Sequence, residues 1–351
     1  MRHKGSRLGQ IELLKPTLSV DEEIVDLAAR LRERIAEYYL NLRPGQCQLQ
    51  LVRLRRAAYS RLYVFHGSSQ GCQSNIRLAI KVYNGADQLL FARQQYDTLN
   101  LLWDDFSKSQ CLKIPRPLDF FPDLPAIVME EVAGCSVQEL VKWASWRRWT
   151  RENAATACQY CGEWLQHFHT ATRIAQGQLD AGEKHKSLQL GVAQLANYGF
   201  AVETCKTLEA KTTLLVGILA QQSEHQSLVH GDFTVDNVLW DGTITTVLDV
   251  EGRYQNLIYH DMASFLNSIA LVSLVLPMRE SVAQACSKAF LVGYLGDGKH
   301  NNSALWFLRV SGLVSVALEV LGRYAGQPLA RIWLRRGLGR LLDRLALEAP
   351  I

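Results

Sequence analysis

Three oxygen-bearing side chains of the sequence, Asp232, Asn237 and Asp249, have the types and the spacing that phosphate chemistry uses. Between the second and the third lie two short apolar runs, residues 238–240 and 245–248, separated by an Asp-Gly pair. Such a pair between apolar runs predicts a β-hairpin, so we expect Asn237 and Asp249 to converge at its open end. Carboxylate and amide oxygens suit a hard divalent ion, most often magnesium that carries a nucleotide's phosphates. The alternative is a solvated hairpin whose acidic residues only cap turns.

Asp232 precedes Asn237 by five residues, and this order of an Asp, an Asn and a metal-binding Asp occurs in the catalytic loop of kinases. Residues 230–232 read His-Gly-Asp where protein kinases have His-Arg-Asp, and residues 248–251 read Leu-Asp-Val-Glu in place of Asp-Phe-Gly. In this form the chain resembles the aminoglycoside phosphotransferase and choline kinase-like family of small-molecule kinases.

The resemblance implies a role for each polar residue around this loop. Asp232 would accept or orient the hydroxyl proton of the acceptor, and Asn237 and Asp249 would hold Mg²⁺. Glu251 would reach a second metal ion or the water shell of the first. Two further residues would support the loop structurally, His230 and Asp261.

A lysine inside an apolar strand is the first candidate for binding the nucleotide. Lys81 lies within Arg77–Tyr83, where a buried ammonium group needs a partner. The resemblance supplies this partner as the α- and β-phosphates of ATP, whereas the alternative is a lysine on the solvent face of an edge strand. Ser60 belongs to a loop of small residues, 56–60, that would cover the nucleotide although it contains no glycine.

The resemblance places two more nucleotide-binding elements downstream. Gln95 takes the helix position at which family members carry the glutamate that pairs with the strand lysine; it can accept a hydrogen bond but brings no charge. Backbone groups between Glu130 and Val132 would bind the adenine, at the hinge between the lobes.

The fold that the resemblance implies is α+β, with the two lobes of a protein kinase. Residues 1–45 would form an N-terminal helical extension. Residues 46–132 would form a nucleotide-binding N-lobe of antiparallel sheet plus helix. Residues 133–351 would form a mostly helical C-lobe that contains the small catalytic hairpin and the acceptor site.

Local patterns predict several individual elements. The apolar spacing of Asp87–Phe106 is typical of a helix, and Ser136-Val-Gln-Glu139 is a capping box at a helix start. The stretch His66–Asn75 is expected to be a plain hairpin connection, and the charged, glycine-containing stretch Gln176–Lys186 is expected to be a loop. His169, within a predicted helix, is expected to be a satisfied core histidine.

Composition limits the class of protein. The chain has 351 residues, 48% of them hydrophobic, which favours a soluble globular protein of two lobes. A formal net charge of +4 is too small to indicate a nucleic-acid partner. Two apolar stretches, Met262–Met278 and Ala304–Gly322, contain polar or charged residues and are expected to be buried helices rather than membrane spans.

The cysteines and the start of the chain point to a cytoplasmic protein. The basic start is followed by no apolar run of signal length, and the eight cysteines show no disulfide-framework spacing, so reduced thiols are expected. Cys158 and Cys161 form a lone C-x-x-C pair inside a helical pattern and are expected to be packed helix positions rather than ligands of zinc.

These observations favour an ATP- and Mg²⁺-dependent phosphotransferase acting on a hydroxyl of a small molecule or glycan. Between Ala304 and Arg344 the sequence has seven arginines against Glu319 and Asp343. This balance favours a neutral or anionic sugar-like acceptor over a polycationic aminoglycoside. The sequence indicates no particular oligomeric state.

Two other classes of function stay open at this point. With Gln95 in place of a glutamate and a nucleotide loop without glycine, the chain could be a catalytically weak, nucleotide-binding scaffold. An anion- or glycan-binding module without nucleotide would require Lys81 and the three residues of the hairpin site to be coincidental.

Overall fold

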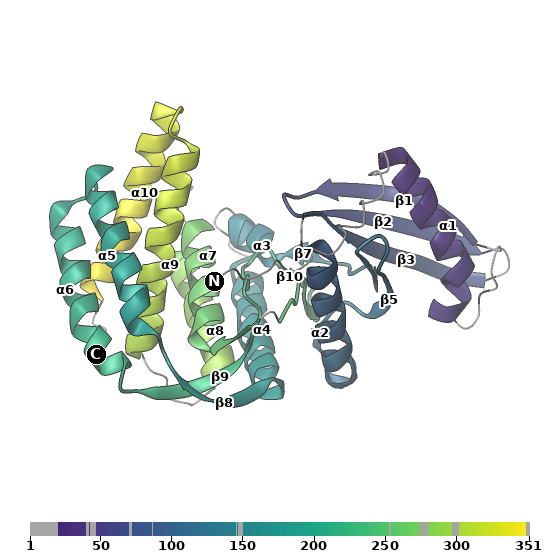
Figure 1. Ribbon diagram of the computed structural model, residues 1–351, viewed down its shortest axis with the longest axis horizontal. Coiled ribbons are helices and arrows are strands. Elements are labelled where there is room, and N and C mark those ends of the chain that lie inside the picture. Colours follow the sequence, from purple (N-terminus) through teal and green to yellow (C-terminus); the bar gives the residue numbers. More distant parts are fainter. Residues whose placement is uncertain are drawn as a thin grey trace, which may run out of the picture. The chain divides into compact units, whose positions relative to one another are not determined.

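The computed structural model describes most of the chain in two compact units, Met1–Asn84 and Gly85–Ile351 (Figure 1). The described residues are 20–39, 42, 47–69, 72–85, 87–144, 146, 150–252, 254–272, 274, 280–296 and 302–348. The fold is mixed α+β, with an antiparallel sheet before a largely helical part, as predicted. The predicted lobe boundary after residue 132 stays a prediction.

The first unit is one helix on an antiparallel meander. Its elements are α1 (Val20–Tyr38), β1 (Cys47–Arg56), β2 (Ser60–Ser69) and β3 (Cys72–Tyr83). The amphipathic face of α1 buries Leu27, Leu31 and Ile35 completely. An ion pair of 2.7 Å between Arg61 on β2 and Glu23 on α1 attaches the helix to the sheet.

The prediction of a hairpin connection over His66–Asn75 is confirmed in kind, since β2 and β3 pair antiparallel, but its bounds are too wide. Strand β2 continues to Ser69 and β3 begins at Cys72, and Gly67 pairs with Ile76 inside the ladder. The glycine serves close packing, because a Cβ there would lie 2.7 Å from Cδ2 of Leu49. A glycine within a strand marks such an approach as often as a turn.

The second unit begins with a helix packed on a hairpin. Helix α2 spans Gln88–Lys108, close to the predicted range, and lies against the antiparallel pair β5 (Pro117–Phe121) and β6 (Ala126–Glu130). The rings of Tyr96 and Phe120 stack between them with centroids 5.6 Å apart.

The predicted hairpin is present as β10 (Val238–Trp240) and β11 (Thr245–Val247), flanked by β7 (Cys135–Ser136) and β4 (Leu112–Lys113). Its connection has four residues rather than the two of an Asp-Gly turn, since Trp240 pairs with Thr245. The carboxylate of Asp241 closes it by accepting the backbone N–H groups of Ile244 and Thr243, which lower the pKa of Asp241.

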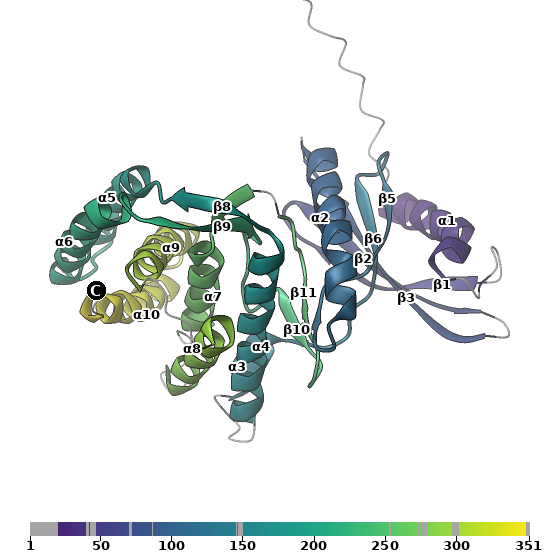
Figure 2. The ribbon, with the colours of Figure 1, turned by 90° about the horizontal axis from the view of Figure 1, so that it is seen from below.

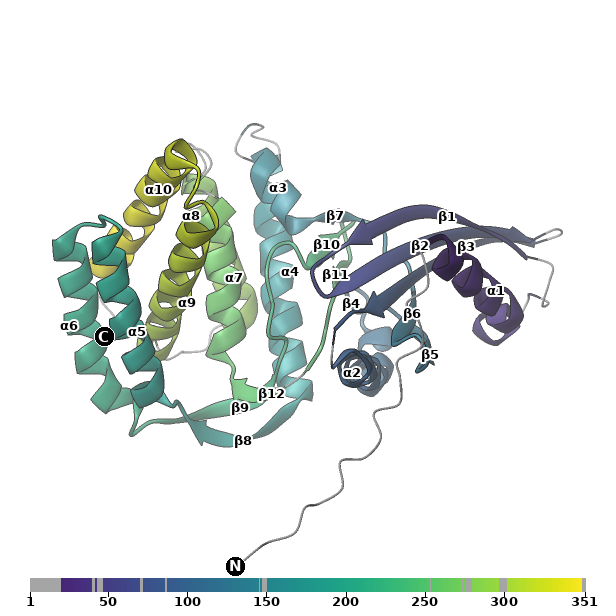
Figure 3. The ribbon, with the colours of Figure 1, turned by 45° about the horizontal axis from the view of Figure 1, so that its top comes forward.

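Eight helices and a three-stranded ribbon make up the rest of the described second unit (Figures 1 and 2). The ribbon runs along one end of the helical layer (Figure 3), in the order β12, β9, β8. The strands are β8 (Arg173–Gln178), β9 (Ser223–Val229) and β12 (Tyr254–Leu257). The helices are α3 (Val137–Ala144), α4 (Thr150–Ala171), α5 (Ala181–Asn197), α6 (Val202–Leu219), α7 (Tyr259–Val272), α8 (Glu280–Leu295), α9 (Asn302–Arg323) and α10 (Pro328–Leu347).

Side-chain caps set two of the helix starts. At α3 the predicted capping box is confirmed: Glu139 N–H donates to Oγ of Ser136 (3.2 Å) and Ser136 N–H donates to the Glu139 carboxylate (3.3 Å). The loop expected over Gln176–Lys186 is wrong, because Asp180 caps α5 by accepting the N–H of Glu183. A helix therefore begins in the middle of that polar stretch.

Helix α9 meets the length and apolar composition of a membrane span, and 56% of its most apolar window is buried inside the second unit. It packs against α5, α7 and α10, with Phe307, Val310 and Ala317 fully enclosed. A buried core helix passes the same test of length and composition, so the finding is a weak indication of membrane insertion.

Helices α4 and α8 approach each other backbone to backbone at two glycines. A Cβ built on Gly162 would lie 2.2 Å from the carbonyl oxygen of Phe290, and one on Gly293 would lie 2.0 Å from that of Gln159. Cys158 and Cys161 are fully buried on α4, where burial helps to raise the thiol pKa values, so they are packed positions as predicted. This contact fixes the separation of two helices that both carry residues of the site described below.

We expect Gly293→Ala to lower the free energy of unfolding by about 1–3 kcal/mol, because the added methyl group has no space, although alanine alone favours a helix by up to about 1 kcal/mol. The control is Gly217→Ala on α6, whose added Cβ would meet nothing within 4 Å. Urea denaturation should show the control unchanged or more stable. Equal effects of the two substitutions would contradict the close helix contact.

Candidate active site

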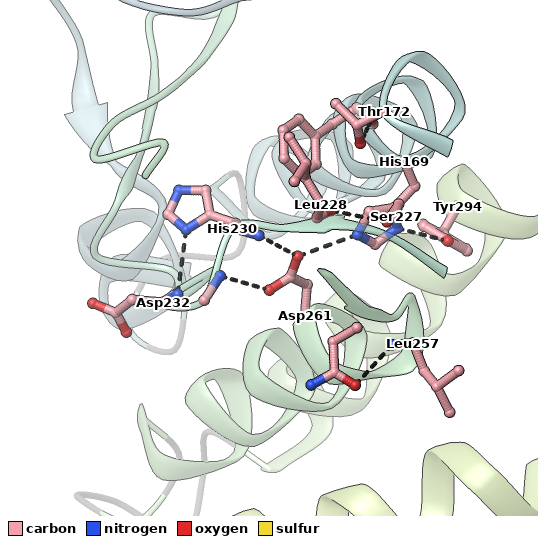
Figure 4. A network of polar contacts seen from close by, with 12 residues as sticks. His169, Thr172, Ser227, Leu228, His230, Asp232, Leu257, Asp261 and Tyr294 are labelled. Atoms are coloured by element: carbon pink, nitrogen blue, oxygen red, sulfur yellow. Dashed lines mark hydrogen bonds and ion pairs between the residues drawn. The ribbon is translucent and has the colours of Figure 1, made fainter. Parts of the chain in front are cut away.

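A buried carboxylate holds the backbone of the loop that follows β9. Asp261, in the first turn of α7, is 1% exposed and accepts the backbone N–H groups of His230 (2.7 Å) and Gly231 (3.0 Å). Its Oδ2 also lies 3.1 Å from Nε2 of His169 on α4 (Figure 4). Burial would raise the pKa of Asp261, but the hydrogen bonds from His169 and the His230 backbone contribute to a net lowering, so the group is an anion.

The far nitrogen of His169 is satisfied by a tyrosine of α8. Nδ1 of His169 lies 2.8 Å from the hydroxyl of Tyr294. Burial raises the pKa of Tyr294 well above its ordinary value, so the hydroxyl keeps its proton and can donate it to Nδ1. The neutral Nε2–H tautomer of His169 then satisfies both contacts, and the prediction of a satisfied core histidine is confirmed.

His230 connects the loop to the end of the hairpin. Its Nε2 donates to the carbonyl oxygen of Leu248 (2.8 Å), and its Nδ1 accepts the backbone N–H of Asp232 (3.3 Å). These two bonds require the neutral Nε2–H form of the ring. The N–H of Leu248 in turn donates to the carbonyl oxygen of Asn237 (2.8 Å). The backbone of Leu248 therefore bonds both to His230 in the loop and to Asn237 before β10, and Asp249 is the next residue.

The loop turns sharply and then anchors itself in the core. Gly231 has φ +87, a left-handed conformation that a residue with a side chain adopts only at a cost. Two residues later Phe233 is completely buried; its ring stacks on that of Trp164 with centroids 5.7 Å apart and is tilted against that of Phe265 at 5.1 Å. Sequence reasoning missed Phe233; an aromatic ring within a mostly polar loop was the available signal.

The structure brings the predicted base and the first predicted metal ligand into direct contact. Nδ2 of Asn237 donates to both Oδ2 and the carbonyl oxygen of Asp232, each at 2.9 Å. Because the amide nitrogen makes these bonds, the orientation of the amide is fixed and its oxygen is the atom left to meet a cation. That arrangement fits a hard divalent ion, whose ligands are oxygens.

Asp249 follows β11 in an unusual backbone conformation, with φ +55. The chain then passes α2, where the carbonyl oxygen of Glu251 lies 3.0 Å from the hydroxyl of Thr98. Gly252, also at φ +55, sits against Thr98, since a Cβ there would lie 2.8 Å from its Cγ2. A strained aspartate held between a hairpin and a helix contact is typical of a functional position.

The predicted metal ligands are one amide and two carboxylates rather than a cluster of acidic residues and histidines. No three His, Cys, Asp or Glu side chains come together as a metal site within the part of the chain that the structure describes. The predicted ligands Asn237, Asp249 and Glu251 carry oxygen atoms, which Mg²⁺ binds together with oxygens of phosphate and water.

The predicted nucleotide-binding residues fall in both units. Within the first, Ser60 opens β2 after a three-residue turn, and Lys81 is 7% exposed on β3 with its ammonium 4.7 Å from the ring centroid of Tyr83. Within the second, Gln95 is buried on α2 and Glu130 ends β6.

The predicted hinge differs in one detail from a simple adenine-binding strand. The N–H of Glu130 donates to the carbonyl oxygen of Arg116, and the two side chains form an ion pair of 3.1 Å. A backbone donor for adenine would therefore come from a later residue, such as Val132 in the coil after β6.

Asp232 lines a cavity of about 370 Å³ within the second unit. One stripe of α7, at helical spacing, forms a wall with His260, Ser264, Asn267 and Leu271. Helix α9 contributes further lining residues, and α5 contributes Lys184. The size suits a small molecule or one end of a larger one.

The arginine-rich C-terminal part does not line this cavity. Arg309 pairs with Glu348 (3.3 Å), and the other arginines between Arg323 and Arg344 lie outside the cavity as well. Sequence reasoning therefore based the acceptor's charge on the wrong residues. Among the described residues that line the cavity, the charged side chains are Lys184, Asp232 and Asp261, and Lys184 lies in the stretch that was expected to be a loop.

Replacing Asp261 by asparagine is expected to lower the free energy of unfolding by about 3–5 kcal/mol, because it breaks a buried network and leaves partner groups unpaired. The control is Asp97→Asn, which removes an exposed pair with Arg93 and should cost less than about 1 kcal/mol. Denaturant titrations of both variants provide the comparison. Similar small losses would show that Asp261 does not hold the loop.

Comparison with known proteins places this geometry in a family. The model of the phosphotransferase enzyme family APH matches residues 50–285, about two thirds of the chain. A comparison with curated protein sequences finds no match.

Several solved structures share the fold. A glucosamine kinase in complex with glucosamine, ADP and inorganic phosphate is 15% identical, with a TM-score of 0.60 over 93% of this chain and 84% of that one. A choline/ethanolamine kinase family protein from Mesorhizobium loti is 14% identical, with a TM-score of 0.52 over 92% and 95%. A spectinomycin phosphotransferase in complex with ADP and spectinomycin is 12% identical, with a TM-score of 0.53 over 95% and 98%.

These likenesses confirm the expected kinase-like fold. The family model covers both the sheet of the first unit and the loop, hairpin and Asp261 of the second. The chain belongs to the APH phosphotransferase enzyme family and is an ATP-dependent small-molecule phosphotransferase.

Proposed function

We propose that this protein transfers the γ-phosphate of ATP to a hydroxyl group of a neutral or anionic, sugar-like small molecule or glycan end. The observation that carries the proposal is the position of Asp232, which lines a cavity while its carboxylate is held from the side by Asn237. A carboxylate at the edge of a small cavity can meet the hydroxyl of a molecule bound there.

The chemistry follows from the residues around Asp232. The acceptor oxygen forms a bond to the γ-phosphorus as the bond to the bridging oxygen of ADP breaks, and the hydroxyl proton passes to the Asp232 carboxylate. Asn237 and Asp249 would hold Mg²⁺, with Glu251 near them, and the ion would neutralise the phosphate charge. His230 and Asp261 keep the loop in the geometry that this transfer needs.

Three upstream residues are assigned to the nucleotide. Lys81 would contact the α- and β-phosphates, and Ser60 and Gln95 are assigned to nucleotide binding as well. The glucosamine kinase and the spectinomycin phosphotransferase of similar fold were both solved with ADP, which supports a nucleotide in this fold. The same two proteins bind acceptors that are small molecules, in accord with the cavity beside Asp232.

The place of the reaction is part of the proposal. Seven cysteines, Cys47, Cys111, Cys135, Cys158, Cys161, Cys205 and Cys286, are free thiols, and five of these seven are buried. Free thiols suit the reducing cytoplasm, where ATP is also available. A catalytically weak, nucleotide-binding scaffold is the competing function, and turnover measurements on the following variants separate the two.

Asp232→Asn should reduce phosphoryl transfer on the order of 10²–10⁴-fold, because the amide cannot take the hydroxyl proton. Nucleotide affinity should stay near that of the wild type, since Asp232 faces the acceptor cavity. The measurement is ATP consumption with a panel of sugars and amino alcohols, alongside calorimetric titration with ATP and Mg²⁺. Equal losses of turnover and nucleotide binding would contradict the assigned role.

Asp249→Ala should act differently, by removing nucleotide affinity that depends on Mg²⁺. Titration of the variant with ATP in the presence and absence of Mg²⁺ tests this, with Asp241→Ala as the control, because Asp241 lies on the far end of the same hairpin. Wild-type dependence on Mg²⁺ in Asp249→Ala would remove this residue from the metal site.

A further inference from the structure

The cavity beside Asp232 has little negative charge to offer a cationic ligand. Among the residues that the structure describes, two carboxylates line it, Asp232 and Asp261. The second is committed to two backbone N–H groups and to His169, and it is almost completely buried. Only Asp232 is left to face a bound molecule, and the transfer reaction needs it for the acceptor hydroxyl.

A cationic side chain reaches the same cavity from α5. Lys184 stands in the first turn of that helix, where the Asp180 cap fixes the backbone, and it is half-buried at the cavity wall. His260 faces it from α7; burial and the charge of Lys184 lower the pKa of His260 to about 4, so the imidazole is neutral at pH 7. The ammonium group of Lys184 is therefore close enough to act on groups inside the cavity.

Two other wall residues carry polar atoms that suit hydroxyl groups. Nε2 of His260 and Oδ1 of Asn267 are buried without a hydrogen-bond partner, and both residues lie on the cavity-lining stripe of α7. The amide of Asn267 is oriented by the bond from its Nδ2 to the carbonyl oxygen of Arg309. These two atoms have unused hydrogen-bonding capacity, and a ligand hydroxyl group can serve both, since it donates and accepts.

We propose that Lys184 selects the acceptor by charge, so that the molecule which enters the cavity is rich in hydroxyl groups and carries no ammonium group. The inference rests on the proposed function, because it takes this cavity as the acceptor site. An amino group on the acceptor would be brought close to a like charge in a partly desolvated wall, with a single carboxylate to compensate it. Lys184 acts here as a specificity-determining residue and takes no part in the transfer.

The test uses two charge-reversal variants of α5. The binding of two sugars that differ in one functional group is measured for each variant. Lys184→Glu changes the cavity, whereas Lys186→Glu changes an exposed position of α5 and gives the same net charge. The probes are glucose and glucosamine, whose 2-hydroxyl is replaced by an ammonium group. Affinities are measured on the full chain by calorimetry with ADP and Mg²⁺ present, and phosphoryl transfer is followed in parallel.

We expect the wild type to bind glucose more tightly than glucosamine. In Lys184→Glu the ratio of the two dissociation constants should shift toward glucosamine by about tenfold or more, while Lys186→Glu should change it less than about twofold because solvent and salt screen that charge. Tighter binding of glucosamine by the wild type, no binding of glucose, or equal shifts in the two variants would each overturn the proposal.

A second readout needs no ligand. If Lys184 faces the cavity, the imidazole resonance of His260 should titrate at higher pH in Lys184→Glu than in the wild type and remain unchanged in Lys186→Glu, as followed by NMR. An unchanged midpoint in Lys184→Glu would count against the proposal. A failure of the proposed function alone would give a different result. The sugars would bind with the expected charge preference, but no phosphate would be transferred to them.

Discussion

The structure around the catalytic loop depends on one buried anion, the carboxylate of Asp261. Removing a carboxylate from water costs several kcal/mol, and it is tolerated only where hydrogen bonds replace the lost hydration. Here two backbone N–H groups and an imidazole provide them. Because backbone donors cannot be moved without moving the chain, the requirement to satisfy this carboxylate also fixes the conformation of the loop that carries Asp232.

The same network extends across three helices. Asp261 lies on α7, His169 on α4 and Tyr294 on α8, so the geometry of the loop depends on how these helices pack. The close contact of α4 and α8 at Gly162 and Gly293 sets their separation. Tyr294 follows Gly293 directly. The glycine that allows α8 to approach α4 is therefore adjacent to the tyrosine that bonds His169 on α4. The packing of α4 against α8 therefore contributes to the position of Asp232.

On its other side the loop faces a cavity whose charge differs from what a polycationic acceptor would need. Lys184 and a neutral His260 are at the wall, and the arginines of α9 and α10 do not line the cavity; Arg323, for example, pairs with Glu319. The charge that matters for recognition is the charge within a few ångströms of the ligand, since exposed charges beyond about 10 Å are screened at physiological salt.

The amino-acid sequence by itself determined what depends on neighbours along the chain: the hairpin, the capping box at Ser136, the helix over most of Asp87–Phe106, and the spacing of Asp232, Asn237 and Asp249. Those features follow from local backbone preferences and short-range hydrogen bonds. Tertiary structure alone decided that Tyr294 completes the network of Asp261, that Thr98 holds the carbonyl of Glu251, and that Lys184 rather than the arginines reaches the cavity. These contacts join residues more than forty positions apart, and which of many polar side chains become neighbours is set by how helices pack, which no local pattern encodes.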